Sequence, residues 1–410
     1  MRIVVIGAGA AGVFGAISAA THDPLAEIAV IEAARQPLAK VRISGGGRCN
    51  ITNHCFDPSE LIKNYPRGSK ELLGPFSRFQ PRDTVAWFEK HGVRLKVEND
   101  GRMFPTTDKS ETIAVCLLAA VAKHGIKIRL GAKVKGIQTS THDRNSPKFD
   151  IIYHNSQPER YDRVLLATGG SSQGHRFAEA LGHRIIPPVP SLFTFRVIDQ
   201  RLDGLAGVSF DNVELTLMTG GGKKLKQTGP LLITHWGLTG PSVLKLSSWG
   251  ARILHESDYK AELVVNFLPN QGAEQLYQTL LAYKGQNSKR RVWSANALPV
   301  PKRYWSRIVQ LAGITEETIW TNMTRTDMKS IVHELSRARF TISGKGIFKD
   351  EFVTCGGIDL KDVDFRTMQS KRCPGLYFAG EILDIDGLTG GFNLQNAWTT
   401  GWIAGMNMTL

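Results

Sequence analysis

Four residues near the start of the chain have the spacing of a nucleotide-binding turn. Gly7, Gly9 and Gly12 follow the apolar segment 2–6, and Glu32 comes twenty residues after the last of these glycines. In such a pattern the first glycine permits a tight turn, the second lets the backbone approach a pyrophosphate, and the third lets a helix pack closely against a strand. An acid at this distance accepts hydrogen bonds from a ribose and repels a 2′-phosphate. The pattern therefore predicts FAD or NAD rather than NADP.

The residues around this turn predict the strand, helix and strand that position it. Segments 2–6 and 27–31 are short and apolar, as in buried parallel strands, and residues 13–21 have the composition of a helix. Ala10 and Ala11 are candidate contacts just before this helix, whose N-terminal N–H groups and positive dipole end attract phosphate. The expected fold class is therefore α/β, with a Rossmann-like nucleotide-binding domain.

A second glycine-rich segment, residues 44–53, reads SGGGRCNITN. Three glycines beside an arginine, a cysteine and two asparagines are unlike an ordinary linker, although a flexible turn is the alternative. We expect this loop to contact the nucleotide, through the following residues: Ser44, Gly46, Gly47, Arg48 and Asn50.

Two later segments also end apolar strands in glycine. Residues 164–170 read VLLATGG, and the candidate contacts there are Ala167, Thr168 and Gly169. Residues 375–381 read GLYFAGE and precede a glycine turn and a final helix expected at 394–406, with Asn393 as its N-cap. The candidate contacts in this last region are Gly380, Glu381, Gly391, Asn393 and Leu394.

A nucleotide site built from both chain ends requires that the middle of the chain be an insertion. We expect a FAD-binding domain at 1–187 and 350–410 and an inserted substrate domain at 188–349. The insertion divides into a β-rich part, 188–268, and a helical part, 269–345. Glycines 220–222 fit a hairpin turn, and no second dinucleotide fingerprint follows a strand. NAD(P)H is therefore expected to bind only transiently, as electron donor.

Seven segments, in this order, resemble the BaiN/YhiN-like family of FAD-dependent flavoproteins. They are GAGAAG at 7–12, SGGGRCNITN at 44–53, GRMFP at 101–105, LLATGG at 165–170, THWGLTGP at 234–241, TCGGID at 354–359 and the block at 375–398. The resemblance implies bound FAD, an inserted β-rich domain with a helical subdomain, and Glu381 on the ribityl chain. Some members reduce C=C bonds in bile acids, some oxidise amines, and the YhiN (RdsA) branch makes dihydrouridine in ribosomal RNA.

One departure from the family concerns the substrate. In many members a longer loop rich in proline and glycine follows the ATGG segment, whereas residues 171–175 here lead directly into a helix expected at 176–181. The mouth of the substrate site therefore differs from that of the family.

Reduction of an activated C=C bond needs a hydride and a proton. Cys49 is the candidate proton donor, because related folds carry this loop toward the flavin and an ordinary thiol is protonated at neutral pH. The alternative for Cys49 is a small packing residue. Arg48 would stabilise developing negative charge or instead clamp a phosphate. His235, in the sequence THWG, is a second candidate donor, with a structural histidine as its alternative.

The net charge of +14 indicates either an anionic binding partner or simply a basic, soluble surface. The insertion 188–349 holds 21 Lys and Arg against 12 Asp and Glu. Residues 275–315 contain no acid but seven basic side chains, with Tyr and Trp residues among them. We expect this segment to bind ribosomal RNA or its precursor. The alternatives are a solvated basic face and a small-molecule substrate.

The remaining composition narrows the class of protein. No apolar run is long enough to span a membrane, and the chain opens without a charged leader region, so a cytoplasmic protein without a membrane partner is expected. The five cysteines are scattered and lack C-x-x-C spacing, which argues against disulfides and a metal site. The sequence leaves the oligomeric state open.

Overall fold

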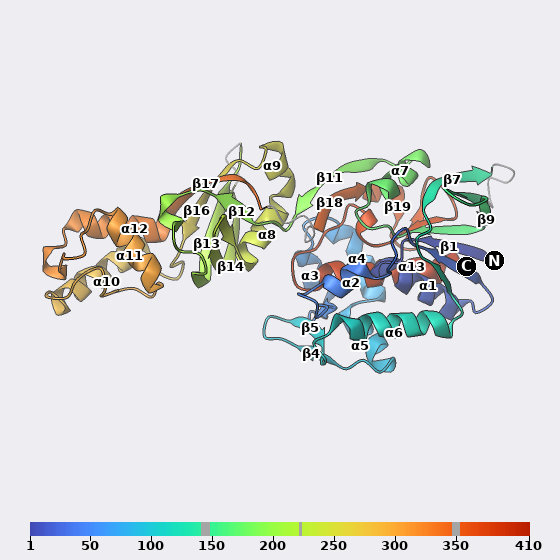
Figure 1. The fold of residues 1–410 in the computed structure, drawn as a ribbon, viewed down its shortest axis with the longest axis horizontal. Coiled ribbons are helices and arrows are strands. Elements are labelled where there is room, and N and C mark those ends of the chain that lie inside the picture. The colour runs from blue at the N-terminus through green and yellow to red at the C-terminus, as the bar shows by residue number, and fades with distance from the viewer. Residues whose placement is uncertain (141–147, 221–223, 347–352) are drawn as a thin grey trace. The chain divides into compact units, whose positions relative to one another are not determined.

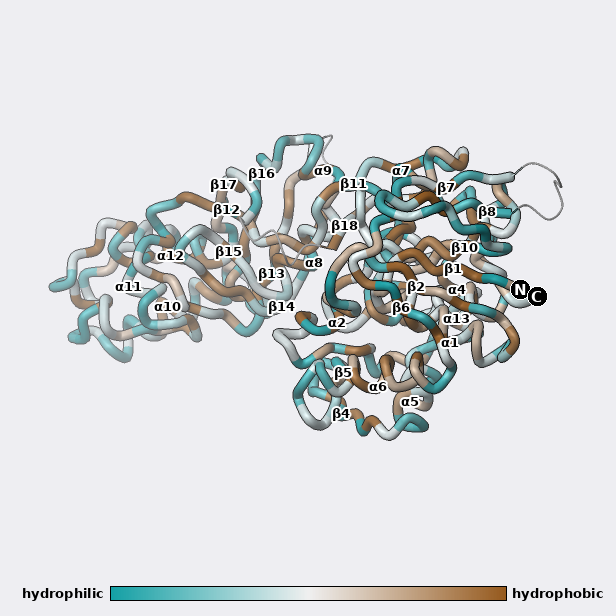
Figure 2. Tube along the Cα trace, turned by 45° about the vertical axis from the view of Figure 1, so that its right-hand side comes forward, coloured by the Kyte–Doolittle hydropathy of each residue, from teal (hydrophilic) through white to brown (hydrophobic). Residues whose placement is uncertain are grey.

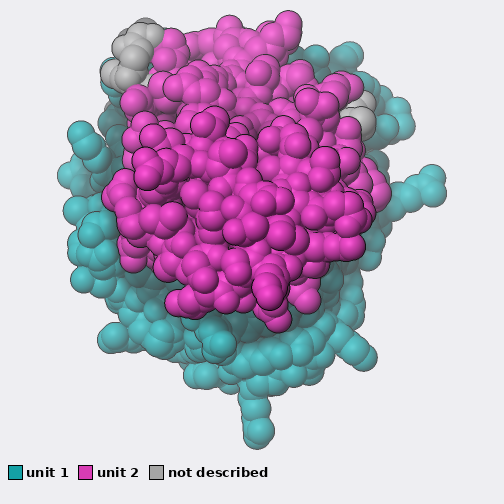
Figure 3. Space-filling view, turned by 90° about the vertical axis from the view of Figure 1, so that its left-hand side faces the viewer, with its two compact units in different colours: residues 1–189, 353–410 teal, residues 190–352 magenta. Residues whose placement is uncertain are grey.

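The computed structural model describes residues 1–140, 148–220, 224–346 and 353–410. The chain divides into two compact units, residues 1–189 with 353–410 (unit 1) and residues 190–352 (unit 2). They are teal and magenta in Figure 3. These bounds lie close to the predicted ends of the insertion, 188 and 349.

Unit 1 is built on a mostly parallel sheet with the strand order β19-β20-β21-β10-β1-β2-β6 (Figure 1). Its strands, in chain order, are β1 (Arg2–Ile6), β2 (Glu27–Ile31), β6 (Lys127–Arg129), β10 (Arg163–Leu166), β19 (Val363–Asp364), β20 (Gln369–Ser370) and β21 (Leu376–Phe378). Val4 of β1 lies beside Val164 of β10 and Ala29 of β2, and all three are buried. Strands covered on both faces read as continuous apolar runs, and they are largely brown in Figure 2.

Helices and smaller sheets complete unit 1. The helices are α1 (Ala10–His22), α2 (Ala39–Ile43), α3 (Pro58–Leu61), α4 (Ser69–Arg78), α5 (Pro81–Lys90), α6 (Ser110–Lys123), α7 (Ser172–Ala180) and α13 (Phe392–Met408). One small sheet has the order β3 (Thr52–Asn53), β5 (Arg102–Pro105), β4 (Leu95–Val97), and another has β7 (Val134–Ser140), β8 (Lys148–Tyr153), β9 (Glu159–Tyr161). A further pair is β11 (Ile185–Ser191) with β18 (Val353–Ile358).

Two glycines let α13 lie directly against α1. A Cβ added to Gly405 would lie 2.3 Å from the carbonyl oxygen of Gly15, and one added to Gly401 would lie 2.6 Å from that of Ala11. Only glycine allows backbones to come this close. The last helix of the chain is thereby fixed beside the first.

Unit 2 contains a closed barrel with the order β12-β15-β14-β13-β16-β17. Its strands are β12 (Phe195–Val197), β13 (Ser209–Met218), β14 (Lys224–Thr234), β15 (Gly237–Thr239), β16 (Ala261–Asn266) and β17 (Ala338–Lys345). Helices α8 (Pro241–Trp249), α9 (Ala251–Glu256), α10 (Ala273–Gln286), α11 (Lys302–Leu311) and α12 (Arg325–Arg337) belong to the same unit. Strands β13 and β14 pair as the expected hairpin, although Gly221 and Gly222 lie outside the described residues.

The predicted helical part, 269–345, is too long, because its last segment is a strand. Residues 338–345 form β17, which pairs with β16 and β12 and so closes the barrel. Ala338, Phe340 and Ile342 are buried there, while Arg339, Thr341 and Ser343 between them are exposed. This alternation is the pattern of a strand with one buried face.

Candidate functional site

The carboxyl ends of three adjoining parallel strands bring the predicted nucleotide-binding segments together. Strand β10 lies between β1 and β21 and is parallel to both. Gly7, Ala167 and Gly380 therefore follow neighbouring strand ends, although they are hundreds of residues apart at the extremes. In open α/β sheets this edge is where ligands bind.

The first glycine turn has one face packed and one face open. A Cβ added to Gly7, whose φ is +108°, would lie 2.4 Å from Ala167 O, and one added to Gly12 would lie 2.0 Å from Gly7 O. A Cβ added to Gly9 would meet no atom within 4 Å. The space beside Gly9 adjoins the first turn of α1, formed by Ala10 and Ala11, whose N–H groups have no carbonyl one turn earlier. This cradle fits the pyrophosphate of a dinucleotide.

Glu32 is fixed at the end of β2 beside this turn. One carboxylate oxygen accepts a hydrogen bond from Ala8 N at 2.8 Å, and the other accepts one from Ala34 N at 2.8 Å. The side chain is only half-buried, and each carboxylate oxygen retains a second lone pair. Glu32 thus holds the glycine turn and keeps an acceptor for ribose hydroxyls.

The loop at residues 44–53 follows α2 and keeps two glycines open. The Ser44 hydroxyl donates to Val41 O at 2.9 Å, and Cys49 N donates to Ser44 O at 2.9 Å, which closes the loop on itself. Cβ atoms added to Gly46 and Gly47 would meet nothing within 4 Å. Both glycines are exposed, but Gly47 N donates to Ser44 O at 3.2 Å and Gly47 O accepts from Ser110 N at 2.8 Å. Their contact with the nucleotide stays a prediction.

The structure gives Arg48 partners other than a cofactor. Its guanidinium lies 2.6 Å from a Glu98 carboxylate oxygen and 3.6 Å from one of Asp108, and it covers the Phe104 ring at 4.0 Å. The hydrogen bond with Glu98, the strongest influence, raises the pKa of Arg48. Two carboxylates already neutralise this cation, so its predicted role as phosphate clamp or catalytic charge is not supported.

The structure also contradicts Cys49 as proton donor. A thiol that delivers a proton to a bound ring needs surface facing that ring, and Cys49 is 0% exposed within the core of unit 1. Burial raises its pKa to about 12, against which a hydrogen bond with Ser44 acts only weakly. Its backbone has a left-handed φ of +62°. The packing role, which the sequence left as the alternative, is the one observed.

Asn50 and Asn53 fasten this loop to the glycine turn before α13. In the amide orientation that satisfies its neighbours, Asn50 donates to Thr52 O at 3.0 Å and accepts from Gly391 N at 2.9 Å. Asn53 Nδ2 donates to Gly390 O at 3.0 Å. The two segments predicted to contact the nucleotide from opposite chain ends are therefore one connected structure.

The prediction that Asn393 caps the final helix is wrong. Helix α13 starts at Phe392, its N-cap is Gly391 with φ of +88°, and Asn393 lies inside the first turn together with half-buried Leu394. The Asn393 amide instead accepts from Gly387 N and donates to Gly387 O, both at 2.8 Å. Asn393 therefore stabilises the preceding turn, because its side-chain amide pairs with both backbone groups of Gly387, as a neighbouring strand would.

Glu381 gathers groups from several elements next to the end of β10. One carboxylate oxygen accepts from Thr354 N at 3.0 Å, and the other pairs with Lys40 Nζ at 2.5 Å. A Cβ added to Gly169 would lie 3.6 Å from the second oxygen. Gly380 N is used internally, since it donates to the Thr400 hydroxyl at 2.9 Å. Glu381 thus lies beside Gly169, and its place on the ribityl chain stays what the resemblance implies.

Of the polar side chains there, Thr168 is a predicted contact, whereas His175 is not singled out by the sequence. His175, in α7, is 5% exposed, and neither ring nitrogen nor the Thr168 hydroxyl has a hydrogen-bond partner among the described residues. Burial lowers the pKa of His175, while the Ile382 backbone and the Glu381 charge oppose the shift. In the sequence, His175 is marked only by lying shortly after the ATGG segment. The local pattern does not distinguish it from an ordinary helix residue.

Polar contacts within the core fix the start of α13. Gln395 is fully buried, and its amide oxygen accepts from the hydroxyls of Thr52 at 2.6 Å and Thr84 at 2.9 Å. Its amide nitrogen donates to the Thr399 hydroxyl at 3.0 Å. A buried network with its donors and acceptors matched gives the helix one orientation.

His235 lies in unit 2, exposed in the turn between β14 and β15. The neighbouring Thr234 hydroxyl donates to Gly237 O at 3.1 Å, which shapes that turn. No hydrogen bond or ion pair of the His235 ring occurs among the described residues. Its role as a proton donor stays a prediction.

The segment 275–315 differs from its predicted role in part. Tyr304 and Trp305 are buried in the core of unit 2, so these two rings cannot stack on bases. Several cations bond to their own unit: Lys284 donates to Met323 O, Arg303 to Gly204 O and Arg307 to Asp203 O, and Arg291 pairs with Glu317. Only Lys289, Arg290 and Lys302 are exposed without such side-chain contacts among the described residues.

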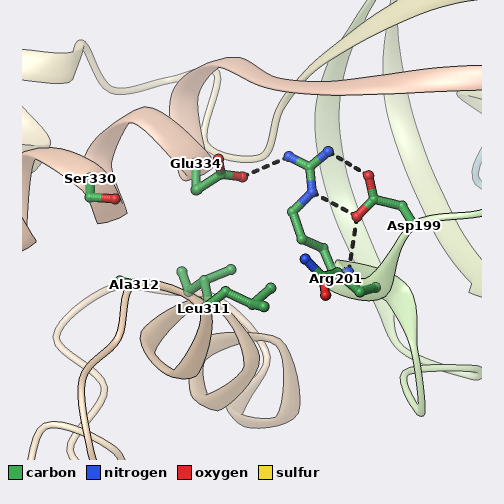
Figure 4. Close-up of a pocket in the computed structure, with 8 residues that line it drawn as sticks. Asp199, Arg201, Leu311, Ala312, Ser330 and Glu334 are labelled. Atoms are coloured by element: carbon green, nitrogen blue, oxygen red, sulfur yellow. Dashed lines mark hydrogen bonds and ion pairs between the residues drawn. The ribbon is translucent and has the colours of Figure 1, made fainter.

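Unit 2 also holds a pocket of about 440 Å³ (Figure 4). Arg201 forms one wall, where its guanidinium bonds Asp199 at 2.7 and 2.8 Å and Glu334 at 2.8 Å. Leu311 at the end of α11, its C-cap Ala312 and Ser330 of α12 lie across from it. Because both carboxylates already hold the guanidinium, the pocket offers no available cation for an anionic ligand.

Two absences hold for the described parts of the chain. No helix there is both long and apolar enough to cross a bilayer. No group of three or more metal-ligating side chains is found there either.

Comparison with protein families and curated proteins gives matches along the whole chain. The family model described as HI0933-like protein Rossmann domain matches residues 1–407. A ribosomal RNA dihydrouridine synthase of Escherichia coli is 29% identical over 418 residues, covering 99% of this chain and 97% of the relative. A 3-dehydro-bile acid delta(4,6)-reductase of Clostridium scindens is 28% identical over 412 residues, covering 98% of each chain. The Haemophilus influenzae ribosomal RNA dihydrouridine synthase is 28% identical over 416 residues.

Solved structures share the fold at low identity. The 3-ketosteroid delta1-dehydrogenase of Sterolibacterium denitrificans has a TM-score of 0.52 at 13% identity and covers 99% of each chain. A flavocytochrome c3 fumarate reductase in an open conformation has a TM-score of 0.50 at 17% identity, covering 100% of this chain and 78% of the other. These likenesses concern the fold.

Proposed function

Because the chain belongs to the HI0933-like Rossmann family of FAD-dependent oxidoreductases, we propose that it reduces the uracil ring of uridine in ribosomal RNA. The reaction adds two electrons and two protons across one ring C=C bond, with NAD(P)H as the source of the electrons. Three curated relatives of similar identity include two ribosomal RNA dihydrouridine synthases, so family membership alone supports a reductase and leaves the substrate to other observations.

The residues of unit 1 fit FAD as the cofactor. The open backbone at Gly9 and the first turn of α1 would hold the pyrophosphate, and Glu32 would accept from ribose hydroxyls. Glu381, fixed by Thr354 and Lys40, would accept from hydroxyls of the ribityl chain. When bound, the flavin supplies hydride transfer, and the protein supplies orientation and electrostatics.

The charge of unit 2 is the observation that favours RNA over a small apolar substrate. Residues 190–352 carry 21 Lys and Arg against 14 Asp and Glu, an excess of seven positive charges. Lys289, Arg290 and Lys302 are exposed there, and none has a carboxylate partner among the described residues. Cations that remain available at the surface bind phosphate through release of counterions.

Nucleoside analysis of ribosomal RNA tests the proposal. We expect RNA from a strain lacking the gene to lose dihydrouridine relative to its parent, and the wild-type gene to restore it. A gene carrying Gly9→Val, which blocks the open cradle, should not restore it. Unchanged dihydrouridine in the deletion strain would overturn the proposal.

A flavin-dependent ene-reductase acting on a small molecule is the second candidate. It is favoured by full-length similarity to the bile acid reductase of Clostridium scindens. Anaerobic mixing separates the two candidates. If the protein acts on RNA, flavin bleached by NADH or NADPH is reoxidised by uridine-containing RNA. If it is a small-molecule ene-reductase, the bleached flavin is reoxidised by a free unsaturated ketone. The amine oxidase alternative predicts bleaching by an amine without any nicotinamide.

A further inference from the structure

A row of basic side chains follows one side of α12. Arg325, Lys329, His333 and Arg337 succeed one another at intervals of four residues, and all four are exposed. Residues four apart lie on the same side of a helix, about 6 Å apart along its axis. We call these four residues the α12 row. It extends over about 18 Å by the same rise per residue.

The α12 row has no acidic partner among the residues that the structure describes. The acids of the helix are used elsewhere: Glu334 pairs with Arg201 at 2.8 Å, and Asp327 caps the helix by accepting from Thr324 N at 2.8 Å. The buried face of α12 is formed by Met328, Ile331, Val332 and Leu335. Arg325 lies beside the buried face, and the row turns away from it along the helix. Arg337, three residues after Glu334, adjoins that acid on the helix surface, but the Glu334 carboxylate is held by Arg201.

The row is unfavourable for the helix by itself. Arg325 and Lys329 are like charges four residues apart, and such a pair destabilises an isolated helix by about 0.2–0.5 kcal/mol. Arg325 is the first residue of α12, where the positive end of the helix dipole disfavours a cation. Arg337, in the last turn, is favoured by the helix dipole. Arg325 and Lys329 have no such local benefit, in contrast to Arg303 and Arg307 of α11, which bond to backbone carbonyls of their own unit.

We propose that the α12 row binds the phosphate backbone of the RNA substrate. The inference rests on the proposed function and deepens it by placing the contact outside the segment 275–315. Lysine and arginine on one helix side can meet successive phosphates, and such contacts position a nucleic acid without reading its sequence. The row therefore orients RNA on unit 2, whereas selection of the uridine belongs to other residues.

A charge-removal variant tests the row. The triple substitution Arg325→Gln, Lys329→Gln, Arg337→Gln removes three charges and keeps good helix formers. The matched control is Lys123→Gln, Lys127→Gln, Lys135→Gln, which removes three exposed charges from unit 1 that have no carboxylate partner among the described residues. Both variants are compared with the wild-type holoenzyme by fluorescence anisotropy, using a labelled ribosomal RNA fragment that contains uridine. The salt concentration is varied between about 50 and 200 mM, because protein–nucleic acid affinity changes strongly over this range.

The expected result is a change in affinity and in its dependence on salt. Loss of three phosphate contacts should make the slope of log affinity against log salt less steep by about 2, and raise the Kd at low salt at least about tenfold. The control should change neither by a comparable amount. Flavin content and thermal unfolding should match the wild type, which shows that the variant is folded.

Three results would overturn the inference while leaving the proposed function intact, two of them from the variants and one from the wild type. One is that the α12 variant binds RNA with wild-type slope and Kd. The other is that both triple variants lose affinity equally, which would indicate an effect of total charge. If the wild-type enzyme prefers vesicles of anionic lipid to RNA, the row serves a membrane and the inference is wrong. Unchanged dihydrouridine in the deletion strain, by contrast, is failure of the proposed function itself.

Discussion

Asp386 and Arg67 form a buried ion pair between two distant segments of the chain. Arg67 Nε lies 2.5 Å from Asp386 Oδ1, and a second arginine nitrogen bonds Oδ2. The Asp386 side chain is 0% exposed and that of Arg67 is 12% exposed. Since Asp386 directly precedes the glycine turn of α13, the pair holds that turn in place from the other end of the chain.

Replacing Asp386 with asparagine should strongly destabilise the protein. The substitution keeps the shape but leaves a buried guanidinium without this counter-charge, which costs about 3–5 kcal/mol. Urea unfolding measures the change, and flavin content should fall with it because Asn50 and Asn53 join this turn to the loop at residues 44–53. Glu317→Gln, which breaks the exposed pair with Arg291, is the control and should cost about 0–1 kcal/mol. Similar losses in both variants would show that burial of the pair does not matter.

Alanine at Gly9 and at Gly12 should separate cofactor contact from packing. Space is open around Gly9, so Gly9→Ala should leave apoprotein stability unchanged and weaken FAD binding at least about tenfold, or about 1.4 kcal/mol. Gly12→Ala would place its methyl group 2.0 Å from Gly7 O and should destabilise the fold itself by about 1–3 kcal/mol. Flavin titration and thermal unfolding of both apoproteins check this. Normal FAD affinity in Gly9→Ala would remove the pyrophosphate from that place.

Cys49 should affect stability at high pH rather than turnover. Its thiol pKa is raised in the folded protein from 9.0 to about 12, so the unfolded chain loses this proton first. The resulting stabilisation is fully present below pH 9 and is lost as pH rises toward 12. Unfolding free energy should therefore fall less steeply over this range in Cys49→Ala than in the wild type, and Cys49→Ala should keep its turnover. An inactive but folded Cys49→Ala would restore the thiol to the chemistry.

Two helical glycines should respond to alanine with opposite signs. Gly405→Ala forces a methyl group to 2.3 Å from Gly15 O, where α13 meets α1, and should destabilise by about 1–3 kcal/mol. Gly285, in α10, has nothing within 4 Å of its Cβ position. Gly285→Ala should therefore stabilise by about 0.5–1 kcal/mol. Thermal unfolding measures both, and stabilisation by Gly405→Ala would refute the close helix contact.

The parts of the site that the sequence predicted are those dictated by backbone geometry. The turn at Gly7–Gly12, the acid at Glu32 and the strand ends before Gly169 and Gly380 depend on short-range spacing, which is visible in one chain. Partners of charged side chains are not visible in this way. Nothing near Arg48 in sequence indicates that Glu98 and Asp108 would neutralise it.

Two other wrong predictions, the stacking role of Tyr304 and Trp305 and the helical assignment of 338–345, are contradicted by local patterns in the sequence itself. Tyr304, Trp305, Ile308 and Val309 recur at helical spacing, which is the pattern of a buried helix face rather than of a stacking surface. The alternation in 338–345 likewise indicates a strand. The error at Asn393 has no such local signal in the sequence. Glycine and asparagine both occur at helix N-caps, and the geometry of the turn determines that Gly391 is the N-cap.

The pairing of β12 with β17 makes unit 2 a removable cassette. Phe195 lies opposite Lys345, so the first and last barrel strands are neighbours, and β11 and β18, which lead to them, also pair. An element whose two ends emerge together can be gained, lost or exchanged by recombination without threading the host sheet anew. Joining β11 to β18 by a short turn would therefore remove unit 2 without changing the strand order of the unit 1 sheet.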